Sequence, residues 1–185
     1  MLALNELVRQ GKVRYVGCSN FSSNQVVEAN TVAEDLEVNR FISCQDEYSL
    51  LVRAIERLLL PTVQEQGMGL LPYFPLASGF LTGKYLPGES FPEDTRFAAW
   101  PHLAKRYMTD ENWDIVQKLN NFCVKNNRSM LELAFSWLAT NPLTASVIAG
   151  ATSLNQVEEN CKAVNWHLSE DDLEVIDTIT NSQQD

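Results

Sequence analysis

A regular alternation of short apolar runs with helical stretches is the feature that most constrains how this chain folds. The apolar runs, rich in β-branched and aromatic residues, cover 13–20, 41–45, 68–77 and 146–152. Because these runs are nearly continuous in apolar residues, they are typical of parallel strands covered by helices. The sequence therefore predicts an α/β fold with about four parallel strands and surrounding helices. Four strands match half of an eight-stranded (β/α)8 barrel.

Capping residues and prolines set the limits of the predicted helices. The Ser22–Ser23 pair offers an N-cap to a helix that runs to about Ala33. Pro61 predicts a kink or a break within a helix over Ala54–Gln66. The stretch 79–108 has little periodicity, so we expect it to be either functional or mobile. The other helices are expected up to Gly11 and over 110–126, 129–139, 153–164 and 169–180.

The composition narrows the class of protein. With 185 residues, of which 45% are hydrophobic, the chain can bury the core of one domain spanning 1–185. The formal net charge is −10 and no cluster of lysine and arginine occurs, so we expect no nucleic-acid partner. No run of 18 apolar residues is present, and the N-terminus is not a signal peptide because its basic residues follow the apolar ones. We therefore expect no membrane association.

The cysteines indicate a reducing compartment and not a metal site. The four cysteines form no C-x-x-C pair, and two histidines could add few further ligands for zinc. We expect reduced, buried thiols, which are typical of a cytosolic, cytoplasmic protein. The residues concerned are Cys18, Cys44, Cys123, Cys161, His102 and His167.

Residues that follow the predicted strands are candidate ligand-binding residues, because parallel α/β folds bind ligands at the carboxyl ends of their strands. Gln45 ends the second strand and either binds a carboxamide or satisfies backbone groups. Tyr73 ends the third strand and either stacks on a planar ring or belongs to the core. Lys84 follows in a loop, where it either reaches a phosphate or is simply solvated. Thr152 and Ser153 begin a helix, and the pattern favours an N-cap role for Ser153 over anion binding.

Four segments, taken in order, resemble signatures of the aldo-keto reductase superfamily. Gly11–Phe21 resembles the fifth strand of that family, and Gln45–Ser49 resembles the end of the sixth. Tyr73–Tyr85 and Gly150–Asn160 are similar to the seventh and eighth strand regions. The resemblance covers essentially the whole chain and is closest to the bacterial relatives of potassium-channel β subunits. It implies the C-terminal half of a (β/α)8 TIM barrel, as a single partial domain over 1–185.

The resemblance also implies a site for NADP(H), extended across the strand ends. Ser19, Asn20 and Gln45 would hydrogen-bond the nicotinamide carboxamide, and Tyr73 would stack on the nicotinamide ring. The contacts to the remainder of the cofactor are carried by two further sets of residues. The backbone of Pro75, Leu76, Ala77 and Ser78, with the charge of Lys84, would line the pyrophosphate, and Arg96 would lie near the adenosine phosphate. The adenosine end would be held by Gly150, Thr152, Gln156, Glu159 and Asn160.

The chain departs from the family pattern at two places in this site. Phe74 stands where related sequences often have a small or polar residue, which removes a side-chain hydrogen bond. The last motif contains no strong basic residue, so a preference for NADP over NAD depends on Lys84, Arg96 and the family likeness.

By resemblance, the whole family enzyme is an oxidoreductase that reduces aldehydes and ketones to alcohols by hydride transfer. Its proton-donating tyrosine and the assisting lysine, aspartate and histidine come from the first four strands. Tyr48 and Tyr85 lie in motifs with other assignments, so we assign no catalytic residue here and expect this truncated chain alone to be inactive. The alternatives are a non-catalytic nicotinamide-nucleotide-binding or regulatory module and a truncated reading frame without a function of its own.

Half of a barrel would leave strand edges and one sheet face without partners, which favours aggregation. We therefore expect a homo-oligomer, pairing with a missing N-terminal half, or poor solubility. A carbonyl compound is the expected small-molecule partner of the completed enzyme.

Overall fold

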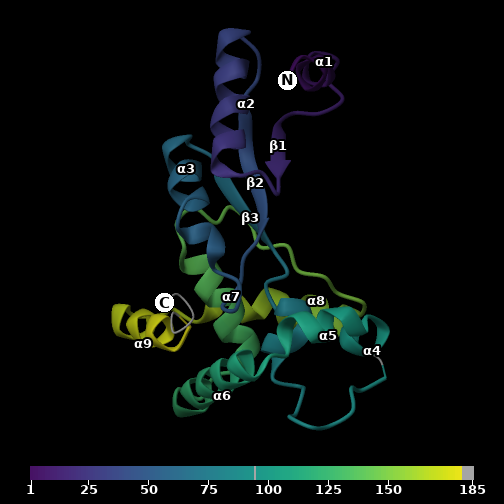
Figure 1. The fold of residues 1–185 in the computed structure, drawn as a ribbon, viewed down its shortest axis with the longest axis vertical. Coiled ribbons are helices and arrows are strands. Elements are labelled where there is room, and N and C mark those ends of the chain that lie inside the picture. The colour runs from purple at the N-terminus through teal and green to yellow at the C-terminus, as the bar shows by residue number, and fades with distance from the viewer. Residues whose placement is uncertain (94, 181–185) are drawn as a thin grey trace.

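The computed structural model describes residues 1–93 and 95–180. Strands and helices alternate in the first part of the chain, and helices dominate the second part (Figure 1). This order confirms the predicted α/β class. The helices are α1 (Leu2–Arg9), α2 (Ser23–Asp35), α3 (Leu59–Glu65), α4 (Arg96–Ala99), α5 (Pro101–Tyr107), α6 (Asp110–Lys125), α7 (Met130–Thr140), α8 (Leu154–Lys162) and α9 (Glu170–Thr180). The strands are β1 (Val16–Ser19), β2 (Phe41–Glu47) and β3 (Gly69–Tyr73), and the 3-10 helices are η1 (Ala54–Glu56), η2 (Ala77–Thr82) and η3 (Ala163–Asn165).

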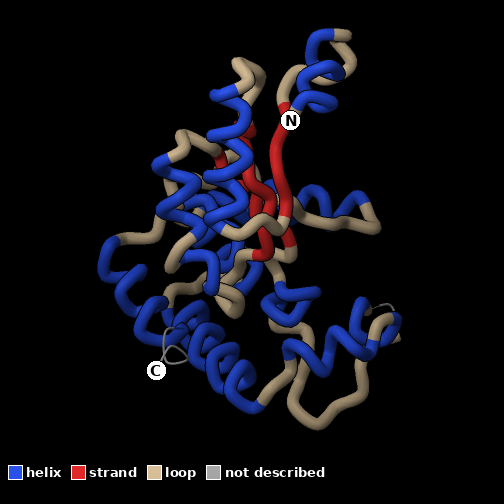
Figure 2. The backbone as a smooth tube through the Cα atoms, turned by 45° about the horizontal axis from the view of Figure 1, so that its top comes forward, coloured by secondary structure: helices blue, strands red, loops and turns tan. Residues whose placement is uncertain are grey.

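The three strands form a parallel sheet in the order β1-β2-β3, visible as neighbouring red segments in Figure 2. In this register Ser19 lies opposite Gln45, so β1 and β2 end side by side. The close approach of these two strands requires glycine at position 17. A Cβ on Gly17 would lie 2.3 Å from Ser43 Oγ and 2.8 Å from the Ser43 carbonyl oxygen.

The fourth strand predicted over 146–152 is not formed as a regular strand, and this corrects the sequence interpretation. The chain does run beside β3, where it makes two isolated parallel bridges, Leu70 with Thr144 and Tyr73 with Ile148. Within the described part of the chain, the sheet ends at β3 and no strand lies beyond this segment. Because the segment has a ladder on neither side, it lacks the regular hydrogen bonding that defines a strand.

Local capping signals place the helices close to where they are predicted. Ser22 and Gln25 form a reciprocal capping box at the start of α2. Ser169 and Asp172 make the same pair of bonds at the start of α9. The helix predicted over Ala54–Gln66 is interrupted, but at Arg57–Leu58 between η1 and α3 and not at Pro61 itself. Pro61 lies in the first turn of α3, where its missing N–H removes no helical hydrogen bond.

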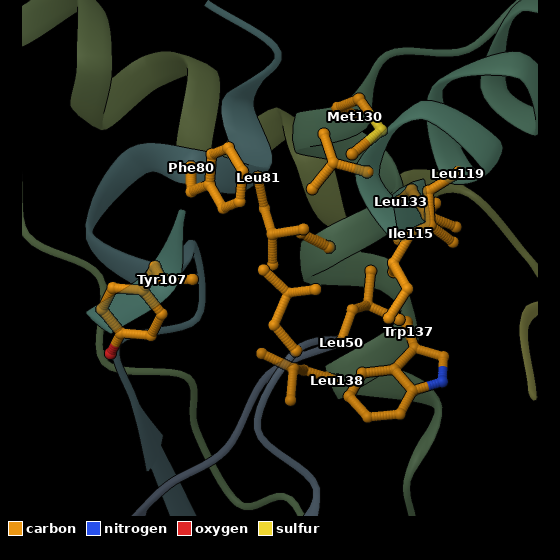
Figure 3. Close-up of a cluster of buried hydrophobic side chains, with 14 of the residues drawn as sticks. Leu50, Phe80, Leu81, Tyr107, Ile115, Leu119, Met130, Leu133, Trp137 and Leu138 are labelled. Carbon is orange, nitrogen blue, oxygen red and sulfur yellow. The ribbon is translucent and has the colours of Figure 1, made fainter. Parts of the chain in front are cut away.

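Two hydrophobic clusters stabilise the fold. The smaller cluster packs α2 and α3 against one face of the sheet and includes Val26, Cys44 and Val63, all fully buried. The larger cluster surrounds α7, toward the carboxyl ends of the strands, and includes Leu133 and Leu138 (Figure 3). The two clusters together fix the strand ends between α3 and α7.

The stretch 79–108, which the sequence left as either functional or mobile, is packed into the larger cluster. Phe97 of α4 is fully buried and stacks on Tyr85, with ring centroids 4.7 Å apart. Tyr107 at the end of α5 is also buried, and its ring stacks on that of Phe97 with centroids 6.5 Å apart. These aromatic contacts hold α4 and α5 near the carboxyl end of the sheet.

Helices cover only one face of the sheet. The opposite face is made up of residues that alternate with the buried ones along each strand, and all of them are half-buried or exposed. They include Gly17, Ser19, Ser43, Gln45 and Leu71. Within the described residues, no helix combines the length and apolar character needed to cross a membrane.

The cysteines depart from the expectation at one position. Cys18, Cys44 and Cys123 are buried free thiols, as predicted. Cys161, in contrast, is exposed on α8. The reason is that α8 contributes no buried residue to the core, so a cysteine there lies at the surface.

Candidate functional site

Polar side chains from three strand ends meet at the carboxyl edge of the sheet. The Tyr73 hydroxyl donates a 2.7 Å hydrogen bond to Asn20 Oδ1, and Asn20 Nδ2 donates to Ser19 Oγ at 3.0 Å. The Asn20 backbone N–H donates to the Gln45 carbonyl oxygen at 3.1 Å. Four residues predicted from three separate segments therefore form one polar group, which we call the strand-end group: Ser19, Asn20, Gln45 and Tyr73.

The geometry of the strand-end group suits recognition of an amide. Asn20 has a φ of 58°, a left-handed conformation that asparagine tolerates better than most residues, and its side chain is exposed. The half-buried Gln45 side chain makes no hydrogen bond to another described residue by ordinary geometric criteria. A primary amide can donate and accept at once, so Asn20 and Gln45 can pair with the amide of a ligand.

Tyr73 is half-buried beside a second aromatic residue. Its ring meets Phe74 edge to face, with centroids 5.3 Å apart. Burial raises the pKa of the Tyr73 hydroxyl, and the nearby carboxylates of Glu47 and Asp46 raise it further. This hydroxyl therefore stays protonated and donates to its asparagine partner across the physiological range.

Phe74, which stands where related sequences often have a small or polar residue, makes a contact that the sequence did not predict. The residue has a φ of 53°, and the Arg96 guanidinium lies 5.5 Å from its ring centroid. A cation above an aromatic face is held electrostatically. The aromatic side chain thus positions Arg96 next to the strand ends in place of making a hydrogen bond.

The loop after β3 has an unusual backbone. Ala77, Ser78 and Gly79 have consecutive positive φ values of 45°, 60° and 97°. Such strain in non-glycine residues is costly and concentrates at functional sites. The N–H groups of Ala77 and Gly79 donate to the carbonyls of Phe74 and Leu76 within the loop, which commits one of the predicted backbone donors, Ala77, to a turn. Pro75 is buried and has no N–H to offer.

Two buried hydroxyls near this loop have no hydrogen-bond partner among the described residues. They are Ser78 Oγ and Tyr85 Oη, on side chains that are 6% and 5% exposed. Buried polar groups without partners are rare in proteins, and each one needs an explanation. A ligand with several acceptor oxygens would supply the missing partners.

The Lys84 side chain lies beside the Tyr85 hydroxyl, next to Gly79. A Cβ built on Gly79 would lie 3.3 Å from Lys84 Nζ and 3.6 Å from Tyr85 Oη, so only glycine leaves this space open. Burial lowers the pKa of Lys84, and the positive charge of Arg96 lowers it further. Within the described chain neither cation forms a salt bridge. Two neighbouring cations and the unpartnered Tyr85 hydroxyl make a site that fits the phosphates of a nucleotide.

The predicted adenosine residues lie on the far side of Arg96, whose Nη2 is 3.7 Å from a Cβ built on Gly150. The Ser153 side chain accepts from the Gln156 N–H at 3.3 Å, which confirms the N-cap role. Gln156 Oε1 accepts from the Thr152 N–H at 2.7 Å. Thr152 and Gln156, both predicted to contact the cofactor, are therefore hydrogen-bonded to each other here. Glu159 and Asn160 follow one turn later on α8, the first exposed and the second half-buried.

One functional contact was missed by sequence reasoning. Glu47 forms a 2.5 Å ion pair with Arg106. It also accepts a short hydrogen bond from the buried Tyr107 hydroxyl. Burial and this carboxylate raise the pKa of Tyr107. These bonds fix the end of α5 to the end of β2, beside Tyr73. The sequence did contain one indication that Glu47 belongs to this region: it follows Gln45 by two residues and therefore lies on the same face of the strand.

Comparison with known proteins identifies the family of the chain. A model described as the aldo/keto reductase family matches residues 1–181. A probable voltage-gated potassium channel subunit beta from Oryza sativa subsp. japonica is 40% identical over 166 residues, which are 88% of this chain and 50% of that protein. An L-glyceraldehyde 3-phosphate reductase from Escherichia coli O157:H7 is 34% identical over 168 residues, 88% of this chain and 48% of that protein.

Protein tas of Escherichia coli K12 is 32% identical over 177 residues, 96% of this chain and 51% of that protein. The chain thus spans about half the length of the curated relatives that it matches. The family model covers nearly all of it, and the sequence resemblance found on the strand-end motifs is confirmed. This chain belongs to the aldo/keto reductase family.

Proposed function

We propose that this chain binds NADP(H) across the carboxyl ends of β1, β2 and β3 and serves in the reduction of aldehydes or ketones to alcohols. The observation that carries the proposal is the approach of Lys84 Nζ and the unpartnered, buried Tyr85 hydroxyl to Gly79, beside the second cation, Arg96. This site adjoins the strand-end group through Phe74 and Arg96. Phosphate and carboxamide recognition therefore lie next to each other, in the order that a nicotinamide nucleotide requires.

In this proposal the strand-end group selects the orientation of the nicotinamide. The amides of Asn20 and Gln45 bind the carboxamide, and Ser19 holds Asn20 in place through their 3.0 Å bond. Tyr73 provides a ring face for the nicotinamide and steadies Asn20 through its hydroxyl. NADPH, when bound, supplies the hydride that reduces the carbonyl carbon.

The phosphates lie in this proposal along the loop Pro75–Ser78, opposite Lys84 and Arg96. The lowered pKa of Lys84 supports this placement, because an anion would relieve its repulsion from Arg96. The adenosine end extends toward Gly150 and α8, where Gln156, Glu159 and Asn160 offer polar groups. Arg96, whose Nη2 lies near Gly150 at the adenosine end, would bind the extra phosphate of NADP and so favours that nucleotide over NAD.

We also propose that residues 1–185 alone hold the cofactor without turnover. Proton donation to a carbonyl oxygen needs a tyrosine whose pKa is brought toward neutrality. At the strand ends, burial and carboxylates raise the pKa of Tyr73 instead. The Tyr48 hydroxyl donates to Glu56, and burial raises its pKa as well. This observation favours the second candidate function, a non-catalytic nucleotide-binding or regulatory module.

The fold proposal that goes with this function is the C-terminal half of a (β/α)8 barrel. Three parallel strands, a fourth segment beside β3 and helices on one sheet face match such a half. The open face and the edge of β1 need a partner, which we propose is a second copy or the other half of a barrel. Light scattering is expected to give a dimer or a larger assembly, and a monodisperse folded monomer would contradict this assignment.

A titration of NADPH fluorescence with the purified protein tests the binding proposal. Saturable binding that is weaker for NADH supports it, and no saturable binding of either nucleotide refutes it. A parallel assay with NADPH and simple aldehydes tests the absence of turnover. Steady oxidation of NADPH by this chain alone, proportional to protein concentration, would show that catalytic groups are present in it.

A further inference from the structure

Two cysteines outside the proposed cofactor site face each other across neighbouring strands. Cys18 of β1 and Cys44 of β2 are directly paired in the parallel register. Both belong to the cluster that packs the sheet against α2 and α3, on the face opposite Gln45. They are free thiols, 8% and 0% exposed. Cys18 is therefore the thiol that a small molecule reaches first.

A buried carboxylate completes this cluster. Cys44 Sγ donates to Asp46 Oδ2 at 3.1 Å, and Asp46 is 8% exposed. Within the described residues no cation forms a salt bridge with this carboxylate. Burial raises the pKa of Asp46, so it is a stronger base than a solvated aspartate. A basic carboxylate that lacks a neutralising cation among the described residues thus accepts a hydrogen bond from the thiol that is shielded from solvent.

We propose that Cys18 and Cys44 form a redox pair that a hydroperoxide oxidises to a disulfide, with Asp46 accepting the proton of the Cys44 thiol. The pairing makes this bond geometrically accessible. Neighbouring strands lie about 4.8 Å apart, and bonded cysteines have Cα atoms about 4.4–6.8 Å apart. Directly opposed positions on neighbouring strands, such as Cys18 and Cys44, therefore have a spacing that suits a disulfide.

The reaction proceeds in two balanced steps. Sulfur of Cys18 attacks one peroxide oxygen, the O–O bond breaks, and the thiol proton leaves with the other oxygen as water, which gives a sulfenic acid. Sulfur of Cys44 then attacks the Cys18 sulfur and the S–O bond breaks. The Cys44 proton passes to Asp46 Oδ2 and on to the departing hydroxide, which gives a second water. Both sulfurs are oxidised and one peroxide is reduced to two waters.

The pKa directions agree with these roles. The contact with Cys44 holds the pKa of Cys18 below its ordinary value, which favours the thiolate at the first attack. The contact with Cys18, burial and the neighbouring Asp46 carboxylate all raise the pKa of Cys44. Cys44 is therefore the resolving thiol and needs a base.

The disulfide would also act on the strand-end group, since Ser19 and Gln45 are the next residues on the two strands. A bond between Cys18 and Cys44 would restrain β1 and β2 directly beside these two residues. This consequence rests on the proposed nucleotide site, whereas the disulfide itself does not. Peptide mapping of the disulfide is therefore the first test, and NADPH binding to the oxidised protein is measured afterwards.

The test is hydrogen peroxide treatment of the folded protein, followed by alkylation of free thiols, digestion without reductant and mass spectrometry. The expected result is a peptide joining Cys18 to Cys44 that has lost two hydrogens and separates on reduction. Cys123 and Cys161 serve as internal controls, the first buried and the second exposed. Alkylation of both Cys18 and Cys44 after treatment, or sulfinic acid at Cys18 without a disulfide, would overturn the proposal.

Asp46→Asn separates the base from the thiol pair while nearly preserving the side-chain shape. We expect the disulfide to form on the order of 100-fold more slowly in this variant. The sulfenic acid at Cys18, trapped with dimedone, should then accumulate. Cys44→Ser should give the same accumulation without any disulfide, and circular dichroism verifies the fold of both variants. An unchanged rate in D46N would remove Asp46 from the mechanism and overturn the assignment.

Discussion

The Tyr73 hydroxyl donates a 2.7 Å hydrogen bond to Asn20 Oδ1, joining the end of β3 to the end of β1 across β2. The two residues are 53 positions apart in the sequence. Asn20 is in a left-handed conformation with an exposed side chain, so this bond and the 3.0 Å bond to Ser19 hold its amide in one orientation. The fold thereby prepares an amide-recognition group before any ligand arrives.

Tyr73→Phe keeps the ring and removes this hydrogen bond. A neutral hydrogen bond contributes about 1 kcal/mol, so we expect NADPH affinity to fall about five-fold. Fluorescence titration measures the change. Tyr15→Phe is the matched control, because Tyr15 is 70% exposed just before β1. Equal affinities of Y73F and the wild type would mean that the hydroxyl does not order the site.

Lys84→Met removes one of the two cations assigned to the phosphates and keeps the length of the side chain. A charge-assisted hydrogen bond contributes about 1.5–3 kcal/mol, so we expect NADPH affinity to fall about 10- to 100-fold. The dependence of affinity on salt should weaken at the same time. Lys118→Met is the control, since Lys118 makes only an exposed i,i+4 pair with Asp114 on α6. Loss of affinity in both variants alike would point to net charge and not to a specific contact.

Gly79→Ala tests the open space at the phosphate loop. Gly79 has a φ of 97°, and a Cβ there would lie 3.3 Å from Lys84 Nζ. We expect a loss of about 1 kcal/mol in unfolding free energy from the backbone conformation, together with weaker NADPH binding. Gly88→Ala has a similar φ of 78° but no atom within 4 Å, so it should lose stability alone. Urea unfolding and NADPH titration measure the two effects, and unchanged binding in G79A would contradict the assigned site.

Glu132→Gln tests the capping box of α7 through its pH dependence. The Ser129 backbone N–H, with further help from Arg128, lowers the pKa of the Glu132 carboxyl. A lowered pKa in the folded state stabilises the fold above the ordinary pKa of glutamate, and this contribution is lost as pH falls. We expect wild type to exceed E132Q by about 1 kcal/mol at pH 7 and by almost nothing below about pH 3. Denaturant unfolding at both pH values checks this, with Glu158→Gln on the exposed face of α8 as the control.

Several elements could be predicted from sequence because their signals are local. The Ser22–Gln25 capping box and the place of Pro61 in the first turn of α3 each depend on residues within one or two turns. Strands β1 and β3 lie within the predicted apolar runs, and β2 begins where its run begins but extends two residues beyond it, to Glu47. The strand-end residues were also identified, because parallel strands present their carboxyl ends at one edge. Their contacts with a cofactor stay a prediction.

Features that depend on distant partners could not be predicted in this way. The run 146–152 has the composition of a strand, yet it pairs with β3 only at isolated bridges, because a strand also needs a ladder. The bonds from Arg106 and Tyr107 to Glu47 join positions about 60 residues apart. Cys161 is exposed because α8 packs no residue into the core, although cysteine is usually buried.

The sequence by itself determined the α/β class, the parallel strands, the helix limits and the family signature, since periodicity and capping act over a few residues. Only the tertiary structure decided which side chains share a space. It brought Tyr73 to the amide of Asn20, Arg96 to the ring of Phe74, and Cys18 opposite Cys44. These relationships arise from packing between elements far apart in the sequence, and no local pattern encodes them.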